Sequence, residues 1–333
     1  MTTKALALFS GGLDSILACR LIAQQGIDVY AVKFISPFFD YQLLGTDYCE
    51  KIHLQYGIQV TLVDISKEYI ALLRSPVHGF GKQFNPCIDC KIFMMSRARQ
   101  MMAEIGASFL ISGEVVGQRP MSQRRDALRV VERDSGCDGL LLRPLCARKM
   151  EPTRAEIDGL VDREGLLDFS GRSRAGQIKL AKEFGIEDYP TPAGGCILTD
   201  PVVGERIKMF YAVHQNITIA DMQLITVGRQ FQLPGGAWLA MGRKEAENII
   251  LEGLTQPGDV LLQLDDRPGP FAVLRYKSCE DDLSLAAGLV ARYGKKNDDG
   301  RPYPGKVRGS CGSDEQILDG IPPTEEEIVS WQR

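Results

Sequence analysis

An alternation of buried-strand and helix patterns in the first half of the chain constrains the fold more than any other feature. Buried strands are predicted by apolar runs over residues 5–9, 29–34, 60–63 and 109–112. Helical patterns lie between them over residues 15–25, 47–56 and 92–105, each followed by a glycine where a helix is expected to stop. Strands that alternate with helices of this length predict an α/β fold with a doubly wound parallel sheet. Ligands of such sheets bind beyond the carboxyl ends of the strands.

The pattern of predicted strands and helices changes in the second half of the sequence. Shorter strands are predicted over residues 237–241, 260–264 and 271–276, with helices over 244–254 and 282–293. We therefore expect two domains, an α/β domain over residues 1–210 and a smaller α+β domain over residues 211–333. The tail beyond Gly312 is polar and contains proline, so we expect it to be poorly ordered.

Composition and charge exclude some classes of protein. With 44% hydrophobic and 25% charged residues and no apolar run near the roughly 20 residues that span a bilayer, the chain is expected to be cytoplasmic, with no membrane partner. The first strand begins almost at once, without a signal-peptide pattern. A net charge of −4 excludes a uniformly basic nucleic-acid binder. Residues 117–182 nevertheless hold fourteen Lys/Arg against ten Asp/Glu, which indicates either a patch for a polyanion or a solvated face.

The segment Ser10-Gly-Gly-Leu-Asp-Ser15 joins the first strand to the first helix. Its glycines let backbone amides approach an anion, and the helix N-terminus adds a positive dipole end. Ser10 and Ser15 are expected to donate to phosphate oxygens, and Asp14 to hold Mg²⁺ against them. The alternative is a plain glycine turn with a Ser/Asp cap. We expect the ATP site to comprise Ser10, Gly11, Gly12, Leu13, Asp14, Ser15, Phe34 and Gly113.

This strand–SGGxDS–helix arrangement resembles the PP-loop ATP pyrophosphatase superfamily. The resemblance implies an adenine nucleotide α-hydrolase-like fold over residues 1–210. It also implies cleavage of ATP between the α and β phosphates, which leaves an adenylated substrate. The loop indicates the class of reaction and leaves the substrate open.

Three of the nine cysteines stand apart from the rest. Six are expected to be structural thiols, namely Cys19, Cys49, Cys137, Cys146, Cys279 and Cys311. Cys87 and Cys90 lie at the head of a predicted helix beside Lys91, a position that favours thiolates. Cys196 follows more than a hundred residues later, in Thr191-Pro-Ala-Gly-Gly-Cys-Ile-Leu198.

The segment Asn85-Pro-Cys-Ile-Asp-Cys-Lys91 is similar to the Asn-Pro-Asp-x-x-Cys-Asn motif of the tRNA 2-thiouridylases, with Cys90 at their catalytic cysteine. Cys87 departs from that motif, and Cys196 resembles the family's second catalytic cysteine. Four interpretations remain. Cys87, Cys90 and Cys196 hold a [4Fe-4S] cluster with one open iron, as in the cluster-dependent tRNA thiolation enzymes that the set resembles. Otherwise Cys90 and Cys196 act through a persulfide, Cys87 and Cys90 form a redox disulfide, or the site binds zinc, for which no fourth ligand is visible.

The segment from Gly113 to Gln123 is similar to a segment of the tRNA 4-thiouridine synthases. The resemblance implies that Gly113 lies near the adenylate, with Gln118 and Ser122 close to the substrate base. An amide-rich polar loop is the alternative. Contacts to the RNA backbone are expected from Arg119, Arg124, Arg125, Arg172 and Arg174.

Leu239-Ala-Met-Gly-Arg-Lys-Glu-Ala-Glu-Asn248 resembles the Gly-Arg/Lys-Asn element of the NFACT RNA-binding domain, and the similarity continues over residues 258–270. A generic β-rich appendage is the alternative. The phosphate loop begins at residue 10, so we expect no room for the N-terminal RNA-gripping extension of the 4-thiouridine synthases. RNA binding would then fall to residues 211–333.

Together these features predict an ATP-dependent tRNA sulfurtransferase with catalytic residues Asp14, Cys90 and Cys196. The expected cofactors are ATP, Mg²⁺ and a [4Fe-4S] cluster, and the expected product is 4-thiouridine rather than 2-thiouridine. The expected partners are tRNA and a sulfur donor, either inorganic sulfide or a cysteine desulfurase. An amide-forming or other small-molecule adenylating enzyme and a non-catalytic tRNA-binding module are the alternatives.

Overall fold

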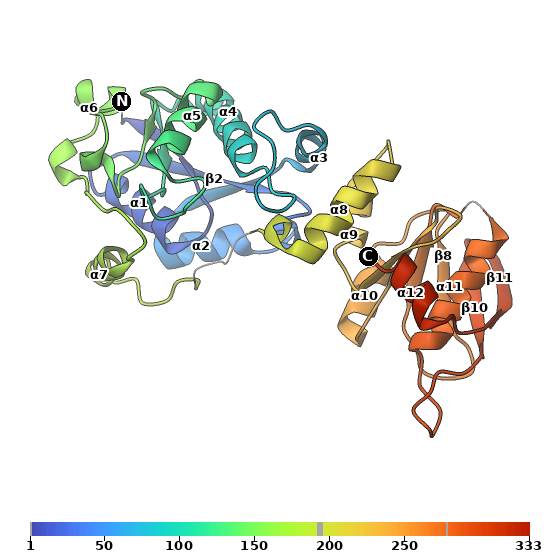
Figure 1. Cartoon of the computed structure of the whole chain (residues 1–333). Helices are drawn as coiled ribbons and strands as arrows, with labels where there is room; N and C mark the ends of the chain where they lie inside the picture. The colour runs from blue at the N-terminus through green and yellow to red at the C-terminus, as the bar shows by residue number, and fades with distance from the viewer. Residues whose placement is uncertain (1, 192–195, 278) are drawn as a thin grey trace. The chain divides into compact units, whose positions relative to one another are not determined.

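The computed structural model describes residues 2–191, 196–277 and 279–333. The chain divides into two compact units, residues 1–200 and residues 201–333, each with its own sheet (Figure 1). Within the described ranges, no helix is long and apolar enough to cross a membrane.

The first unit is built on a five-stranded parallel sheet with strand order β3-β2-β1-β4-β5. The strands are β1 (Lys4–Leu8), β2 (Asp28–Ile35), β3 (Gln59–Asp64), β4 (Phe109–Ser112) and β5 (Leu141–Leu142). The order reverses between β1 and β4, and a ligand of a doubly wound sheet binds at this point. The predicted fold class is confirmed.

Helices cover both faces of this sheet. They are α1 (Leu13–Ala23), α2 (Tyr48–Tyr56), α3 (Ser66–Arg74), α4 (Cys87–Ile105), α5 (Arg125–Ser135), α6 (Arg154–Ile157) and α7 (Ala175–Glu183). Alternation along the strands supplies a buried residue to each side, so Ala5 and Ala7 join the core formed with α1, α2 and α7. On the other side α4 packs against β1, β4 and α5.

Helix α4 begins at Cys87, five residues earlier than its hydrophobic pattern predicts. Both Cys87 and Cys90 therefore lie in its first turn, and Pro86 occupies the N-cap position. The hydrophobic pattern missed this first turn because most of its residues are polar or sulfur-bearing and add no apolar periodicity. The helix ends at Gly106 with φ +69°, as the glycine predicts.

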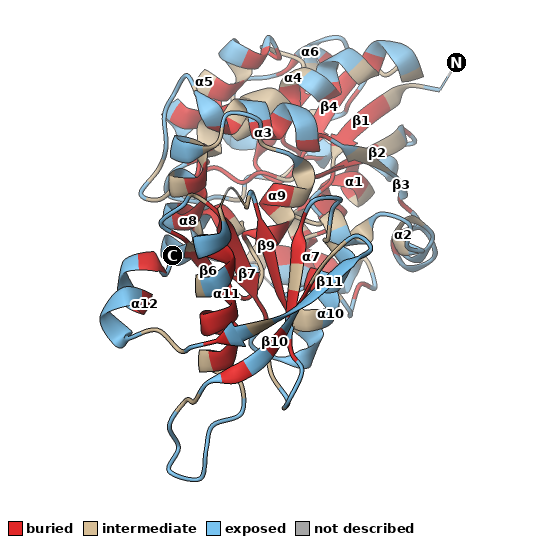
Figure 2. Ribbon diagram, turned by 90° about the vertical axis from the view of Figure 1, so that its right-hand side faces the viewer, coloured by how far each residue is buried: buried red, intermediate tan, exposed pale blue. Residues whose placement is uncertain are grey.

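The second unit holds a six-stranded antiparallel sheet with order β11-β10-β8-β9-β7-β6. The strands are β6 (Arg229–Gln232), β7 (Trp238–Met241), β8 (Val260–Leu264), β9 (Ala272–Arg275), β10 (Gly305–Cys311) and β11 (Asp314–Gly320). The helices are α8 (Pro201–Val213), α9 (Ile219–Leu224), α10 (Glu245–Gly253), α11 (Glu280–Tyr293) and α12 (Glu325–Trp331). Figure 2 shows the buried residues concentrated in β7, β9 and the inner side of α11.

The prediction of a poorly ordered tail beyond Gly312 is wrong. Strand β11 pairs along its whole length with β10, and its side chains are mostly exposed because it is the edge strand of the sheet. Helix α12 then begins with a capping box between Thr324 and Glu327 and buries Ile328 and Trp331 in the core. The polar composition therefore reflects an edge strand and an exposed helix face.

Candidate active site

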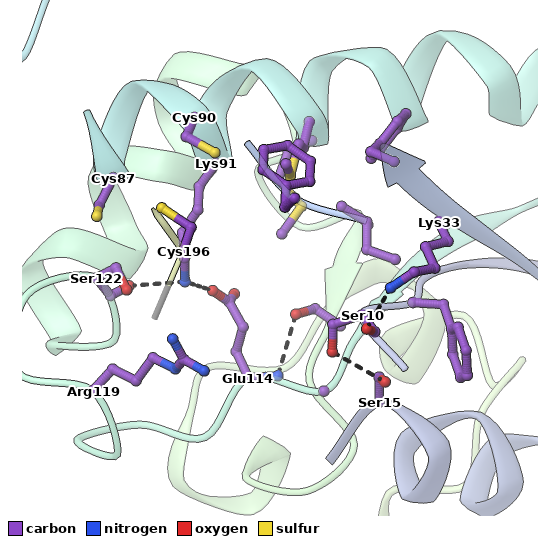
Figure 3. A pocket seen from close by; sticks show the side chains of 18 of the residues that line it. Ser10, Ser15, Lys33, Cys87, Cys90, Lys91, Glu114, Arg119, Ser122 and Cys196 are labelled. Atoms are coloured by element: carbon purple, nitrogen blue, oxygen red, sulfur yellow. Dashed lines mark hydrogen bonds and ion pairs between the residues drawn. The ribbon is translucent and has the colours of Figure 1, made fainter. Parts of the chain in front are cut away.

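A cavity of about 410 Å³ lies in the first unit, where the strands of its parallel sheet end. Its walls come from the ends of β1, β2 and β4, the first turns of α4, and the segment that follows residue 195. The lining includes ten predicted site residues: Ser10, Asp14, Ser15, Phe34, Cys87, Cys90, Gly113, Arg119, Ser122 and Cys196. In Figure 3 the labelled cysteines lie on one side of the cavity, and Ser10, Ser15 and Lys33 lie on the other.

The phosphate loop is held by its own hydroxyl groups. Ser15 Oγ donates to the Gly12 carbonyl oxygen at 2.8 Å, and the Gly12 amide donates to Ser10 Oγ at 3.3 Å. Gly11 has φ +82°, and a Cβ there would lie 2.7 Å from the Tyr48 hydroxyl, so this position requires glycine. The side chain of Leu13 is buried in the core, which leaves only its backbone for a ligand.

Gly113, at the end of β4, touches the phosphate loop directly. A Cβ on Gly113 would lie 2.6 Å from the carbonyl carbon and oxygen of Asp14 and from the Ser15 amide. Only glycine lets the two backbones approach this closely. The predicted association of Gly113 with the ATP loop thus has a direct structural counterpart.

The Asp14 carboxylate is held on one oxygen only. Its Oδ2 accepts from Gln118 Nε2 at 2.7 Å, whereas its buried Oδ1 has no hydrogen-bond donor among the described residues. The Arg174 guanidinium lies 3.9 Å from Oδ1. A buried carboxylate oxygen without a donor fits a hard cation such as Mg²⁺. Gln118 in turn accepts from Gln177 Nε2 at 3.1 Å, so it connects Asp14 to α7.

The three cysteines line the same cavity. Burial raises the pKa of Cys90 to about 12, against a lowering contribution from the Tyr69 hydroxyl, and burial also raises the pKa of Cys196. Burial thus opposes the Cys90 thiolate that a position at the head of a helix favours. Desolvation outweighs the positive charge of Lys91, whose ammonium pairs with Glu114. Asn85 Nδ2 lies 3.1 Å from Cys87 Sγ and fixes that side chain.

Three thiols on one cavity form a donor set suited to an iron–sulfur cluster. In the parts of the chain that the structure describes, no three His, Cys, Asp or Glu side chains are gathered closely enough to hold a metal ion. Cluster binding would therefore require Cys87, Cys90 and Cys196 to lose protons and draw together. The chemistry of the donors fits the cluster, and their present spacing is that of separate thiols.

Comparison with known proteins identifies both units. A model of the "Thiamine biosynthesis protein (ThiI)" family matches residues 1–157, and a model of the "NFACT protein RNA binding domain" matches residues 228–332. Residues 1–157 are thus similar to the ThiI family and residues 228–332 to the NFACT RNA-binding domain, and the resemblances predicted for the two halves are confirmed.

The chain is 25% identical to a probable tRNA sulfurtransferase of Thermococcus kodakarensis, over 50% of this chain and 42% of that protein. It is 32% identical to a probable tRNA sulfurtransferase of Alkaliphilus metalliredigens, over 34% of this chain and 29% of that protein. The chain thus spans less than half the length of these relatives. Among solved structures, a 4-thiouridine synthetase–RNA complex with bound ATP matches with TM-score 0.39 and 22% identity, covering 55% of this chain and 41% of that one.

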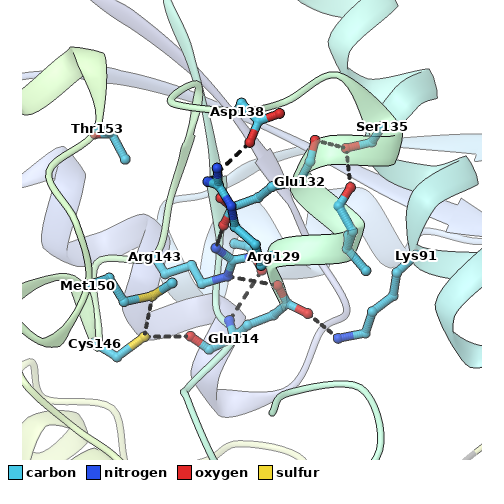
Figure 4. Close-up of polar contacts among 12 residues, drawn as sticks. Lys91, Glu114, Arg129, Glu132, Ser135, Asp138, Arg143, Cys146, Met150 and Thr153 are labelled. Carbon is cyan, nitrogen blue, oxygen red and sulfur yellow. Dashed lines mark hydrogen bonds and ion pairs between the residues drawn. The ribbon is translucent and has the colours of Figure 1, made fainter. Parts of the chain in front are cut away.

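A buried charge network in the first unit includes Lys91 and Glu114 of the cavity lining and was not predicted (Figure 4). Lys91 and Arg143 both donate to Glu114, Arg143 through Nε at 3.0 Å, and Arg143 also pairs with Glu132. Burial raises the pKa of Glu114, but the adjacent Lys91 and Arg143 outweigh it and hold the pKa at about 2. The network connects the cysteine helix α4 to the end of β4 and to α5.

The predicted RNA-contacting arginines separate into two groups. Arg119 lines the cavity and Arg174 lies near Asp14. Arg124, Arg125 and Arg172 are exposed, with Arg124 paired to Asp126 at 2.8 Å. The first unit thus places Arg119 in the lining of the cavity, Arg174 beside Asp14, and the other three arginines on its surface.

Lys33 and Tyr69 also line the cavity, and sequence patterns did not single them out. Lys33 interrupts an otherwise apolar strand, and such a charge in a buried run is a signal that points to a site. Tyr69 gives no such signal, because an aromatic residue on an amphipathic helix is typical of core packing.

Proposed function

We propose that the chain is an ATP-dependent tRNA uridine thiolase that favours 4-thiouridine over 2-thiouridine. The observation that carries this proposal is the shared cavity, in which an intact phosphate loop faces Cys87, Cys90 and Cys196. Activation of the uracil carbonyl by ATP and delivery of sulfur must take place at the same carbon atom. This cavity brings together the phosphate loop for the first step and the cysteines for the second. Relatives named tRNA sulfurtransferase support the same activity.

In the first step a uracil carbonyl oxygen attacks the α-phosphorus of ATP, and pyrophosphate leaves. The amides of residues 11–13 and the hydroxyls of Ser10 and Ser15 orient the phosphates. Asp14 would hold Mg²⁺ through Oδ1, which accepts no hydrogen bond from the described residues and lies 3.9 Å from the Arg174 guanidinium. This catalysis consists of positioning and charge neutralisation.

In the second step sulfide attacks the activated carbon, the carbon–oxygen bond breaks, and AMP leaves. Cys87, Cys90 and Cys196 would hold a [4Fe-4S] cluster, which supplies an open iron that carries sulfide. In the second route a cysteine desulfurase would leave a persulfide on one of Cys90 and Cys196. The outer sulfur attacks the activated carbon and AMP leaves. The other cysteine then attacks the S–S bond, which releases the thiocarbonyl product and leaves a Cys90–Cys196 disulfide for a thiol reductant to restore. Either route requires Cys90 to lose its proton. Burial opposes this loss because it raises the pKa of the Cys90 thiol.

The proposed RNA partner is tRNA. Its recognition would combine residues 228–332, which match an RNA-binding family, with Arg119 and Arg174 near the cavity. The preference for the 4-thio product rests on the similarity of the Gly113–Gln123 segment to the tRNA 4-thiouridine synthases. The close approach of Gly113 to Asp14 and Ser15 supports a position of this segment beside the nucleotide. The sulfur donor is proposed to be inorganic sulfide or a cysteine desulfurase.

The test is mass spectrometry of tRNA nucleosides from a strain that lacks the gene. We expect 4-thiouridine to be lost from this strain. It should return when the wild-type chain is supplied and stay absent when the Cys196→Ala variant is supplied. Loss of a 2-thiouridine derivative instead would overturn the preference for 4-thiouridine. An unchanged set of thionucleosides would refute thiolation as the function.

A further inference from the structure

Lys33 is a buried lysine at the edge of the phosphate loop. It lies near the carboxyl end of β2, is only 3% exposed, and lines the cavity (Figure 3). A buried ammonium is costly unless it is paired, so its partners indicate what the position does.

The partners place the Lys33 ammonium against the first residues of the loop. Nζ donates to the Ser10 carbonyl oxygen at 2.7 Å and pairs with Asp40 Oδ2 at 2.6 Å. It lies 3.6 Å from the position that a Cβ on Gly11 would take. A lysine has three N–H donors, and two of them are directed to oxygen atoms of Ser10 and Asp40. The Tyr48 ring lies 5.6 Å from Nζ, a contact that needs no hydrogen-bond acceptor. One donor is therefore left for an oxygen of a ligand of the loop.

A ligand can replace Asp40 as the partner of the Lys33 ammonium. Its side chain is 39% exposed, so solvent screens the pair and its contribution is small. Its backbone has φ +59°, in the left-handed region that residues other than glycine seldom adopt. Strained residues of this kind concentrate at ligand-binding sites. The tight turn from Ser36 to Phe39 directs the carboxylate toward Lys33.

The charge of the cavity also points to Lys33. The loop Ser10–Ser15 contains no lysine or arginine, and the cationic side chains in the described lining are Lys33, Lys91 and Arg119. Lys91 is already paired with Glu114 in the buried network. In Figure 3 Arg119 lies on the side of the cysteines, away from Ser10. Arg174 also lies near the loop, 3.9 Å from Asp14 Oδ1, but it is not part of the described lining. Lys33 is therefore the cation of this lining that contacts the first residue of the loop.

We propose that Lys33 binds the β and γ phosphates of ATP and that its ion pair with Asp40 breaks when the nucleotide binds. Asp40 keeps the ammonium paired when no nucleotide is bound, and release of pyrophosphate restores the pair. The inference rests on the proposed function only in requiring that this loop binds ATP.

The test is calorimetric titration of the full chain with Mg·ATP, pyrophosphate and AMP. We expect Lys33→Met to weaken ATP and pyrophosphate at least about tenfold, the loss of one charge-assisted bond, and to change AMP less than about twofold. Asp40→Asn removes the competing carboxylate and should tighten ATP about two- to fivefold. That gain should vanish in the Lys33→Met background.

Equal weakening of AMP and ATP by Lys33→Met would overturn the proposal, because it would show that Lys33 only supports the loop through Ser10. Weaker ATP binding by Asp40→Asn would overturn it as well. Asp40 is half-exposed, so Asp40→Asn tests the exchange even where Lys33→Met does not fold. A wild-type chain that binds no ATP would refute the proposed function itself, whereas wild-type affinity in Lys33→Met refutes only the role of Lys33.

Discussion

Gly113 leaves no room for a side chain where β4 meets the phosphate loop. In Gly113→Ala the new methyl group would overlap the backbone of Asp14 and Ser15, which must shift away from the nucleotide. We expect ATP affinity to fall at least about tenfold, with a loss of about 1–3 kcal/mol in the free energy of unfolding. Titration calorimetry and chemical denaturation measure the two effects.

The matched control is Gly253→Ala, which adds a methyl group at an exposed position with no neighbouring atom within 4 Å. It should leave ATP affinity unchanged. Wild-type ATP affinity in Gly113→Ala would contradict the close packing of the two backbones.

Glu114 makes the stability of the first unit depend on acid. Its folded pKa is about 2, below its ordinary value of 4.5, so the charged form stabilises the fold above that ordinary value. This contribution, on the order of 3 kcal/mol, should be lost as pH falls from about 4.5 to about 2. In Glu114→Gln two buried cations lose their shared partner, and we expect a cost of about 3–5 kcal/mol at pH 7.

Chemical denaturation across this pH range measures the effect, with the exposed Glu183→Gln as control. Glu183 pairs with Lys179 only at 3.9 Å on the surface of α7, so its loss should cost less than about 1 kcal/mol. The same acid dependence in wild type and Glu114→Gln would rule out this role for Glu114.

The buried Cys90 thiol predicts a pH dependence for iron uptake. Because burial raises its pKa to about 12 and iron binds the thiolate, loading releases protons and should become more favourable as pH rises from 7 to 9. Anaerobic reconstitution should give a brown protein with absorbance at about 400 nm. Cys196→Ala should lose most of this band, and Cys311→Ser, in the second unit, should keep it.

A colourless, iron-free protein with full thiolation activity would refute the cluster and leave the persulfide route. Retention of the full band in Cys196→Ala would remove Cys196 from the ligand set.

Linear motifs predicted the residues that act through short segments. Ser10, Asp14 and Ser15 share one loop, and Cys87 and Cys90 share one helical turn, so spacing alone relates them. Lys33, Glu114 and Tyr69 come from three different elements and meet only in the folded chain. Their roles depend on partners distant in sequence, and no local pattern encodes such partners.

At the scale of elements, period and stop signals located most of the strands but fewer than half of the α-helices in the described residues. Strand β4 and strand β8 match their predicted ranges, because their apolar runs are fully bounded by polar residues. Helix α5 was missed although it is strongly amphipathic, since Arg, Asp and Glu dominate it and its buried stripe is narrow. Helix α12 was missed for the same reason.

Helix α12 should nevertheless stabilise the second unit. Trp331→Ala removes a side chain packed in the core of this unit, and we expect a loss of about 3–5 kcal/mol. Val329→Ala, on the exposed side of the same helix, should cost less than about 0.5 kcal/mol. Trp238 remains in both variants, so its fluorescence during denaturation reports on this unit.

Equal stability of Trp331→Ala and Val329→Ala would show that α12 contributes no packing. That result would agree with the poorly ordered tail that the composition of this segment predicts.

For the whole molecule, the uneven distribution of charge would govern how the proposed tRNA partner is bound. The chain carries −4 overall, so contacts to a polyanion must come from local clusters of Lys and Arg. We expect tRNA affinity to fall steeply between 50 and 200 mM salt, and Arg125→Ala to reduce the slope of log affinity against log salt by about 0.7–0.9.

Filter binding at several salt concentrations measures this slope. Lys51→Ala, an exposed lysine paired with Asp47 on α2, should leave the slope unchanged. An unchanged slope in Arg125→Ala would exclude Arg125 from the RNA interface.

The central position of β1 has a consequence for synthesis of the chain. Strand β1 emerges from the ribosome before the rest of its sheet, but one of its two neighbours, β4, follows only about a hundred residues later, and such distant pairings form slowly. The phosphate loop is therefore synthesised long before Gly113, which packs against it, and Cys196 follows later still. A nascent chain that ends before residue 196 would contain the residues of the phosphate loop but lack the last of the three cysteines that line the cavity.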